Sequence, residues 1–456
     1  MKKLLAFIFL VSSLAQAQHT INGTITNALE TDWVILYKVE GARQQFVQNS
    51  TIKKDTIVID AKKQAIGTFQ FQLPETSKAG FYRVTYRTTN PSFVDFIYNK
   101  EDVSFTFHPD YPEQSVTFSK SNENIIYKNY LTEISKAQQK LDSLQITAIK
   151  NPSLDLKTDY KTAFNKINTI QNKYLKNSNG MYVQPFIKAT LRANPSEIKT
   201  TAKDYMSNMT STFFDNMDFT NKTLINSSFL VDRITDYIFY INYSENKEVQ
   251  QKLYKESIKT VLSKVENLPF KKDIIEFLVA QFENTKNLEL IDFLFKNYYE
   301  KLPEEFQNKE YLKEKKALFA TEIGRTAPDF SWKENGKNLK LSTLNDAENY
   351  VLVFWSSGCS HCLKEIPLLH KFMQDKTGAK VVAFSLERND SGWKNMKTTL
   401  PNWHHILGLN KWDNKIARTY NIISTPTYFI LDKDKKIIAK PEELKDLEEY
   451  FLKKDK

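Results

Sequence analysis

Cysteine is almost absent from this chain. Only two of its 456 residues are cysteines, and both lie in one tetrapeptide, Cys359-Ser360-His361-Cys362. Secreted proteins that depend on disulfides for stability carry several cysteines spread along the sequence. The single pair therefore excludes a wider disulfide framework, and its spacing favours reversible oxidation of two thiols that lie one helical turn apart.

Glycine and long apolar runs are also scarce. The 11 glycines argue against a fibrous or disordered chain, whereas 31 Phe and 22 Tyr can fill sizeable cores. The net charge is +10, but Lys alternates with Glu and Asp almost throughout, which indicates a solvated surface rather than a nucleic-acid-binding one. Beyond the first residues no stretch is apolar enough to span a membrane. The length suggests about three domains.

The first 17 residues have the layout of an export signal. Lys2 and Lys3 precede a short apolar run over residues 4–14, and Ala15-Gln16-Ala17 places small residues where a signal peptidase cleaves. The alternatives are a buried helix or a membrane anchor, and the run is too short to cross a bilayer. We therefore expect residues 1–17 to be removed. No cysteine follows the run, which argues against a lipoprotein, so we expect a soluble protein in the periplasm without a nucleic-acid partner.

Two regions precede the cysteine pair. Residues 18–120 contain short alternating runs separated by Asn, Gly, Pro and Asp, which predicts an antiparallel β-sandwich, and we expect a binding or assembly module there. In residues 121–320 apolar side chains recur at helical spacing, which predicts an all-α region. Its aromatic residues are interpreted as core rather than as a ligand groove. One such stripe consists of Ile234, Tyr237, Ile238, Tyr240 and Ile241.

Residues 321–456 alternate between strand and helix patterns, which predicts an α/β layer fold. A buried strand over 350–355 ends just before the tetrapeptide, so a helix should begin at about Cys359. Backbone N–H groups at a helix N-terminus favour a thiolate. We therefore expect Cys359 to be exposed and nucleophilic. Cys362, on the same face one turn deeper, is expected to be shielded and to resolve a mixed disulfide.

Metal binding is the competing use of two cysteines at this spacing. A structural zinc site needs two more ligands, and the chain has no second cysteine pair. His361 points away from the pair on a helix, and the adjacent His404 and His405 have diverging side chains. We expect neither a metal nor any cofactor other than the redox-active disulfide of Cys359 and Cys362.

Several segments around the pair resemble one family, the exported thiol–disulfide oxidoreductases of the TlpA/ResA type, which have a thioredoxin-like fold. These segments are Ala327-Pro328-Asp329-Phe330, Phe354-Trp355, Pro367 and Ser424-Thr425-Pro426-Thr427. The resemblance implies that residues 321–456 form a thioredoxin-like α/β domain in a multidomain α+β protein. It also implies a cis Pro426 that faces the disulfide and a Thr425 backbone that binds an extended substrate segment. The N-terminal region resembles, more loosely, the β-domain of Bacteroidetes members.

Two residues next to the cysteines bear on the chemistry. Glu365 matches the family's buried glutamate, which implies that it shuttles a proton to or from the deeper thiol. A solvated helix glutamate is the alternative. His361 can stabilise the Cys359 thiolate, and a stabilised reduced form makes the disulfide a stronger oxidant. Because Glu365 favours a reductase and His361 a less reducing couple, the direction, reductase or isomerase, stays open.

The predicted function is exchange of the Cys-Ser-His-Cys dithiol with cysteine-containing envelope proteins, with a membrane-bound redox partner that recycles the dithiol. An alternative is an envelope binding or assembly protein in which the thioredoxin-like domain is a redox sensor or scaffold. A peroxiredoxin shares the entry segment but needs Pro and Thr before its cysteine, where this chain has Leu352 and Ser356.

Overall fold

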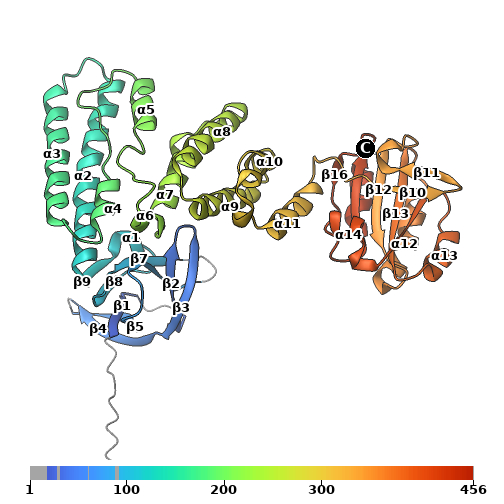
Figure 1. Ribbon diagram of the computed structural model, residues 1–456, viewed down its shortest axis with the longest axis horizontal. Coiled ribbons are helices and arrows are strands. Elements are labelled where there is room, and N and C mark those ends of the chain that lie inside the picture. The colour runs from blue at the N-terminus through green and yellow to red at the C-terminus, as the bar shows by residue number, and fades with distance from the viewer. Residues whose placement is uncertain (1–17, 28–30, 60, 88–91, 455–456) are drawn as a thin grey trace, which may run out of the picture. The chain divides into compact units, whose positions relative to one another are not determined.

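The computed structural model describes residues 18–27, 31–59, 61–87 and 92–454. The predicted export signal, residues 1–17, lies outside them. The chain divides into two compact units, one ending at Phe306 and the other beginning at Gln307. The first unit combines strands and helices (Figure 1). The second contains the cysteine pair. None of the helices in the described ranges has both the length and the apolarity needed to cross a bilayer.

The strands of the first unit form two sheets that pack face to face. One has the order β4-β5-β1-β8-β9 and the other β3-β2-β6-β7. All neighbours are antiparallel except β1 and β8, which run parallel. The predicted β-sandwich is thus confirmed with one parallel ladder in it. In chain order the strands are β1 (Gln18–Ile25), β2 (Trp33–Glu40), β3 (Arg43–Thr51), β4 (Lys53–Ile59), β5 (Lys62–Pro74), β6 (Gly80–Thr85), β7 (Phe93–Tyr98), β8 (Val103–Phe107) and β9 (Thr117–Lys120).

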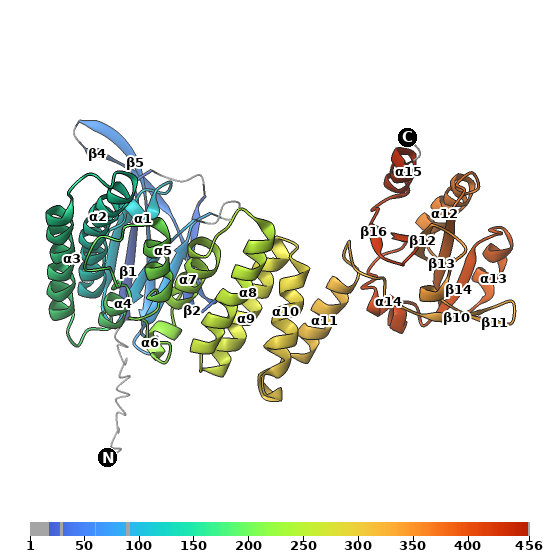
Figure 2. The ribbon, with the colours of Figure 1, turned by 90° about the horizontal axis from the view of Figure 1, so that it is seen from above.

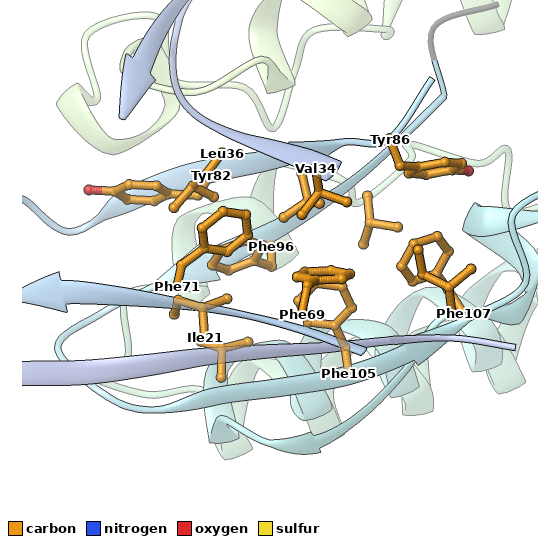
Figure 3. Packing of buried hydrophobic residues seen from close by; sticks show 14 of the residues in the cluster. Ile21, Val34, Leu36, Phe69, Phe71, Tyr82, Tyr86, Phe96, Phe105 and Phe107 are labelled. Atoms are coloured by element: carbon orange, nitrogen blue, oxygen red, sulfur yellow. The ribbon is translucent and has the colours of Figure 1, made fainter. Parts of the chain in front are cut away.

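Alternation along these strands builds the sandwich core. Every second side chain of a strand points to the same face, so apolar residues at alternate positions meet between the sheets. Phe69 and Phe105 come from one sheet and Val34, Tyr82 and Phe96 from the other (Figure 3). The core is rich in aromatic rings, several of which pack edge to face, among them Phe69 against Phe105.

Helices make up the rest of the first unit (Figure 2). Asparagine precedes four of those in the described ranges: the side chains of Asn221, Asn246, Asn267 and Asn287 accept backbone N–H bonds in the first turn. The helices are α1 (Pro112–Ser115), α2 (Asn122–Lys150), α3 (Lys157–Asn177), α4 (Gln184–Ala189), α5 (Ala202–Ser211), α6 (Lys222–Ile225), α7 (Phe229–Thr235), the π-helix η1 (Asp236–Ile241), α8 (Lys247–Lys264), α9 (Leu268–Asn284), α10 (Leu288–Asn297), and the short 3₁₀ turns η2 (Tyr299–Lys301) and η3 (Glu304–Phe306).

The stripe predicted around Tyr237 is only partly buried. Ile234, Tyr237 and Ile238 are buried, but Tyr240 is 72% exposed. The reason is that this segment continues α7 as the π-helix η1, whose wider turn moves later residues off the face that an α-helical period predicts.

The second unit has a five-stranded sheet in the order β14-β13-β12-β15-β16. Its elements are α11 (Lys309–Ala320), the hairpin β10 (Ser331–Glu334) and β11 (Lys337–Lys340), η4 (Leu341–Thr343), β12 (Asn349–Trp355), α12 (Ser360–Met373), β13 (Ala379–Glu387), α13 (Ser391–Thr398), β14 (His404–Leu409), η5 (Lys411–Asp413), α14 (Lys415–Thr419), β15 (Thr427–Asp432), β16 (Ile437–Ala439) and α15 (Leu444–Lys454). The predicted thioredoxin-like α/β arrangement is confirmed.

The central strand β12 is buried along its whole length, with a separate core on each face of the sheet. Val351, Val353 and Trp355 pack with residues of α12 and α15, whereas Leu352 and Phe354 face the hairpin and α14. A continuous apolar run is what a strand covered on both faces requires. The first core also contains Cys362, so the redox pair is anchored directly in the packing of the sheet.

Candidate active site

The site lies at one edge of the second unit's sheet. Strands β12, β13 and β14 are parallel, so their carboxyl ends meet at the same edge. The neighbouring strand β15 is antiparallel and therefore begins there, with Thr427 opposite Phe354. The topology brings together the loop that leads to Cys359, the end of β13, the turn after β14 and the segment 424–426.

Cys359 is the N-cap of α12. Its Sγ accepts the backbone N–H of Cys362 at 3.2 Å, and its thiol donates to the carbonyl oxygen of Thr425 at 3.4 Å. Burial raises the pKa of this thiol, but hydrogen bonds from the side chain and backbone of Cys362 oppose it, and the pKa ends below its ordinary value. A partly exposed sulfur with a lowered pKa is a nucleophile in neutral solution.

Cys362 differs in both respects. It is completely buried, and burial, followed by its hydrogen bond to Cys359, raises the pKa of its thiol to about 12. Both cysteines are free thiols in this structure. Of the two, only Cys359 combines access to solvent with a stabilised thiolate.

Glu365 is held on both of its oxygens. Oε1 lies 3.1 Å from His361 Nε2, and Oε2 accepts a hydrogen bond from the Tyr428 hydroxyl at 2.7 Å. The Glu365 side chain is 16% exposed, against 65% for His361. The His361 imidazole thus lies beside Glu365, and the backbone N–H of His361 is among the groups that lower the pKa of Cys359.

Tyr428 is a residue of the site that the sequence reasoning missed. It is buried in the core that contains Cys362, and its hydroxyl pKa is raised by burial, by its bond to Glu365 and by the charges of Glu365 and both cysteines. Its position two residues after Pro426, at the start of a strand, was the available signal, because strand alternation turns it toward α12.

Glu387 was also missed, and it fixes the loop before Cys359. This buried carboxylate at the end of β13 accepts the backbone N–H of Ser357 at 2.6 Å and the hydroxyl of Ser385 at 2.5 Å. A Cβ on Gly392 would lie only 2.3 Å from the Ser357 hydroxyl oxygen, so the next segment also packs tightly on this loop. The loop is thereby held from the β13 side.

The remaining predicted residues are placed as follows. The Thr425–Pro426 peptide bond is cis, as the resemblance implied, and Thr425 contacts Cys359 through its carbonyl. His404 lies away from the cysteines, with Nδ1 at 2.8 Å from Glu334 and Nε2 at 3.1 Å from Asp346. In the described part of the chain, no group of three or more His, Cys, Asp and Glu side chains is arranged to hold a metal ion.

Comparisons with known proteins agree with this geometry. A family profile described as thioredoxin-like matches residues 348–437. Thiol-disulfide oxidoreductase ResA of Bacillus thuringiensis subsp. konkukian is 30% identical over 138 residues, which are 29% of this chain and 78% of that relative. Thioredoxin-like protein YneN of Bacillus subtilis is 33% identical over 117 residues, 24% of this chain and 65% of that protein.

Among solved structures, a domain of a possible thiol-disulfide isomerase from Cytophaga hutchinsonii is 28% identical, with a TM-score of 0.26, and the match covers 29% of this chain and 93% of that one. The identity to ResA and the share of ResA that is covered settle the family, as the residues around the pair predicted. This chain belongs to the ResA/TlpA-like family of thiol-disulfide oxidoreductases.

Proposed function

We propose that this enzyme exchanges its Cys359–Cys362 dithiol with cysteine-containing proteins of the cell envelope, after export directed by residues 1–17. The observation that carries the proposal is the asymmetry of the two thiols: Cys359 is partly exposed with a lowered pKa, and Cys362 is buried with a pKa raised to about 12. Exchange needs one sulfur that attacks the substrate disulfide and a second that later attacks the mixed disulfide. The three-part layout of residues 1–17 supports the export step.

In the first step the Cys359 thiolate attacks one sulfur of a substrate disulfide. The substrate S–S bond breaks, a bond forms between Cys359 Sγ and the attacked sulfur, and the other substrate sulfur leaves as a thiolate. Hydrogen bonding at the N-terminus of α12 favours ionisation of Cys359 for this attack. The cis segment at Thr425 and Pro426 lies against Cys359 and is the proposed seat of the substrate backbone.

In the second step Cys362 resolves the mixed disulfide. Its thiol gives up a proton, the resulting thiolate attacks Cys359 Sγ, and the bound substrate sulfur leaves. The Cys359–Cys362 disulfide forms, and the substrate gains two electrons, while its two leaving thiolates take up protons from solvent. We assign the proton from Cys362 to Glu365, whose carboxylate lies on the same helix and is held by Tyr428.

The disulfide must then be reduced again, and no cofactor is proposed for this. The proposed reductant is the dithiol of a membrane-bound redox partner, which reduces the Cys359–Cys362 disulfide by the same two-step exchange and is itself oxidised. Because each step is reversible, the same mixed disulfides serve oxidation or isomerisation. The reduction potential of the couple against that of the substrate therefore decides the direction.

The test traps the intermediate. A Cys362→Ser variant expressed in the native envelope should accumulate mixed disulfides through Cys359 that are visible on non-reducing gels and released by dithiothreitol. The Cys359→Ser,Cys362→Ser double variant is the matched control and should capture nothing. Capture of small-molecule thiols alone would contradict a protein-directed role. If Cys359→Ser left the cellular phenotype unchanged, the assembly-protein alternative would replace the enzyme proposal.

A further inference from the structure

A lysine from another part of the chain lies over the residue that precedes Cys359. Strand β14 ends at Leu409, and the next two residues, Asn410 and Lys411, both have positive φ, of 70° and 45°. Such a pair of left-handed residues reverses the chain sharply. The turn lies at the edge where β12 also ends, because β12, β13 and β14 run parallel.

The side chain of this lysine reaches the backbone of Gly358. A Cβ at Gly358 would lie 3.7 Å from Lys411 Nζ and 3.8 Å from Ser356 Oγ. The ammonium group therefore occupies the space next to the backbone of Gly358, one residue before the nucleophile.

The ammonium group of Lys411 has no acidic partner within the described ranges. The closest acidic residue in sequence, Asp413, is paired with Arg418 instead. Glu387 is buried and already accepts from Ser357 and Ser385. Lys411 thus presents an unneutralised positive charge on the surface next to Cys359.

Exposed apolar residues lie close in sequence to Lys411, Cys359 and Thr425. Trp412, which follows Lys411, is 48% exposed, and Leu363, whose N–H bonds to the Cys359 carbonyl, is 44% exposed. Ile423 is 83% exposed and lies two residues before Thr425, the residue that contacts the Cys359 sulfur. A positive charge set among exposed apolar groups suits a polypeptide segment that has both an acidic and an apolar side chain.

The mixed disulfide brings such a segment within reach of Lys411. Cα atoms joined through a disulfide lie about 5.5–6 Å apart, and the next Cα along the substrate is about 3.8 Å further. A residue adjacent to the substrate cysteine can therefore pass over Gly358, where the ammonium group lies. A carboxylate there would form a charge-assisted hydrogen bond, whereas a lysine or arginine would be repelled.

We propose that Lys411, bordered by Trp412, is a specificity subsite that selects protein substrates with an acidic residue next to their reactive cysteine. The inference rests on the proposed exchange function and adds its substrate class. Lys411 contacts the flanking residue of the substrate and takes no part in the bond-making steps.

The experiment compares three disulfide-linked peptides that are identical except for Glu, Gln or Lys next to the cysteine. Each rate constant for reduction by the reduced enzyme at low salt is divided by the rate constant for reduction by dithiothreitol, which removes the intrinsic effect of the flanking charge on the disulfide. The normalised rate should be about fivefold higher for Glu than for Lys, the size expected of a partly exposed charge pair. The ratio should fall toward one as salt screens the charges.

Substitutions test whether Lys411 causes the preference for Glu over Lys. Lys411→Gln should bring the Glu-to-Lys ratio close to one, and Lys411→Glu should reverse the preference. Lys415→Gln, which removes an exposed lysine four residues away on α14, should leave the ratio unchanged. Equal normalised rates in the parent enzyme, or an unchanged ratio in Lys411→Gln, would overturn the subsite. Failure to reduce even the Gln peptide would instead overturn the exchange function, and the subsite with it.

Discussion

The β-sandwich of the first unit and the sheet edge of the second both contain ionisable groups with shifted pKa values, but the surroundings of these groups differ. In the sandwich region burial raises the pKa of Asp95, yet Arg83 holds both of its oxygens at 2.6 and 2.7 Å. At the sheet edge the perturbed groups are two sulfurs, one of which reaches solvent. Burial alone raises a pKa in both regions, whereas Cys359 combines exposure with a pKa that hydrogen bonds lower, and this combination indicates chemistry.

Asp232 strengthens this comparison. Burial raises its pKa to about 6, a value expected of a catalytic carboxylate, although it belongs to α7 in the first unit. The hydroxyl that hydrogen-bonds it, Ser228, is buried, whereas Glu365 lies one helical turn after Cys362, in the helix capped by the partly exposed Cys359. Substitutions can test whether losses of stability and losses of exchange activity fall in different units.

The largest expected effects come from removing the attacking sulfur in one unit and a core side chain in the other. Cys359→Ala should lower the rate of exchange with a small disulfide by at least a factor on the order of a thousand, because the attacking sulfur is lost. It should change stability little, since this sulfur is partly exposed. Phe96→Ala should do the reverse: it empties a buried position in the sandwich core and should cost about 3–5 kcal/mol of unfolding free energy.

These two variants are compared by exchange kinetics and by urea unfolding of the full chain. Phe96→Ala should leave the rate constant of the remaining folded enzyme for a small disulfide unchanged. A large loss of that rate in Phe96→Ala at low denaturant would show that sandwich packing controls the redox edge, and the comparison would fail.

Alkylation should separate the two thiols by about three orders of magnitude. Because the pKa of Cys359 is lowered, its reaction with iodoacetamide should reach half its maximal rate at a lower pH than that of a free cysteine peptide. For Cys362, with a pKa of about 12, the thiolate fraction at pH 8 is only about 10⁻⁴. Its alkylation should therefore begin only at far higher pH. Mass spectrometry of the reduced enzyme measures both sites, and equal rates at pH 8 would contradict the assignment of roles.

Glu365→Gln should slow resolution of the mixed disulfide by about a hundredfold, the size of a lost proton acceptor. Tyr428→Phe should have a smaller effect in the same step, because it removes only the hydroxyl that holds Oε2. Formation of the mixed disulfide should be unaffected in both variants, since that step uses Cys359 alone. Rapid acid quenching with a labelled peptide disulfide distinguishes the two steps. Slower formation of the mixed disulfide with normal resolution would show that Glu365 acts on Cys359 and not on Cys362.

The sequence predicts those parts of the site that are local or belong to a motif. One turn of helix relates Cys359 to Cys362, and the strand before them and the segment at Pro426 have recognisable patterns. The contacts of Glu387 with Ser357 and of Tyr428 with Glu365 join residues 30 and 63 positions apart. No local period encodes such pairs, because strand order and register create them.

The same reasoning explains the partial failure over η1. Helical spacing correctly predicts burial of Ile234 and Ile238, but the π-helical turn that exposes Tyr240 has no signature in the apolar pattern. The direction of the His361 side chain was equally open, since a neighbour in sequence can turn toward the sulfur or along the helix toward Glu365.

The smallest effect is expected from substitution of His361. It tests whether the reactivity of Cys359 depends on the imidazole charge or on backbone N–H groups. The ring is 65% exposed and pairs with Glu365, while the pKa of Cys359 is lowered mainly by hydrogen bonds from Cys362, to which His361 adds only its backbone N–H. His361→Ala keeps that N–H, so the alkylation rate of Cys359 at pH 7 should change by no more than about twofold, as for an exposed ion pair. Lys364→Ala, at a neighbouring exposed position of the same helix, is the control. If His361→Ala moved the pH midpoint of alkylation upward by a full unit, the imidazole would stabilise the thiolate through space. Stabilisation of the Cys359 thiolate would then depend on the His361 imidazole, as the sequence alone suggested.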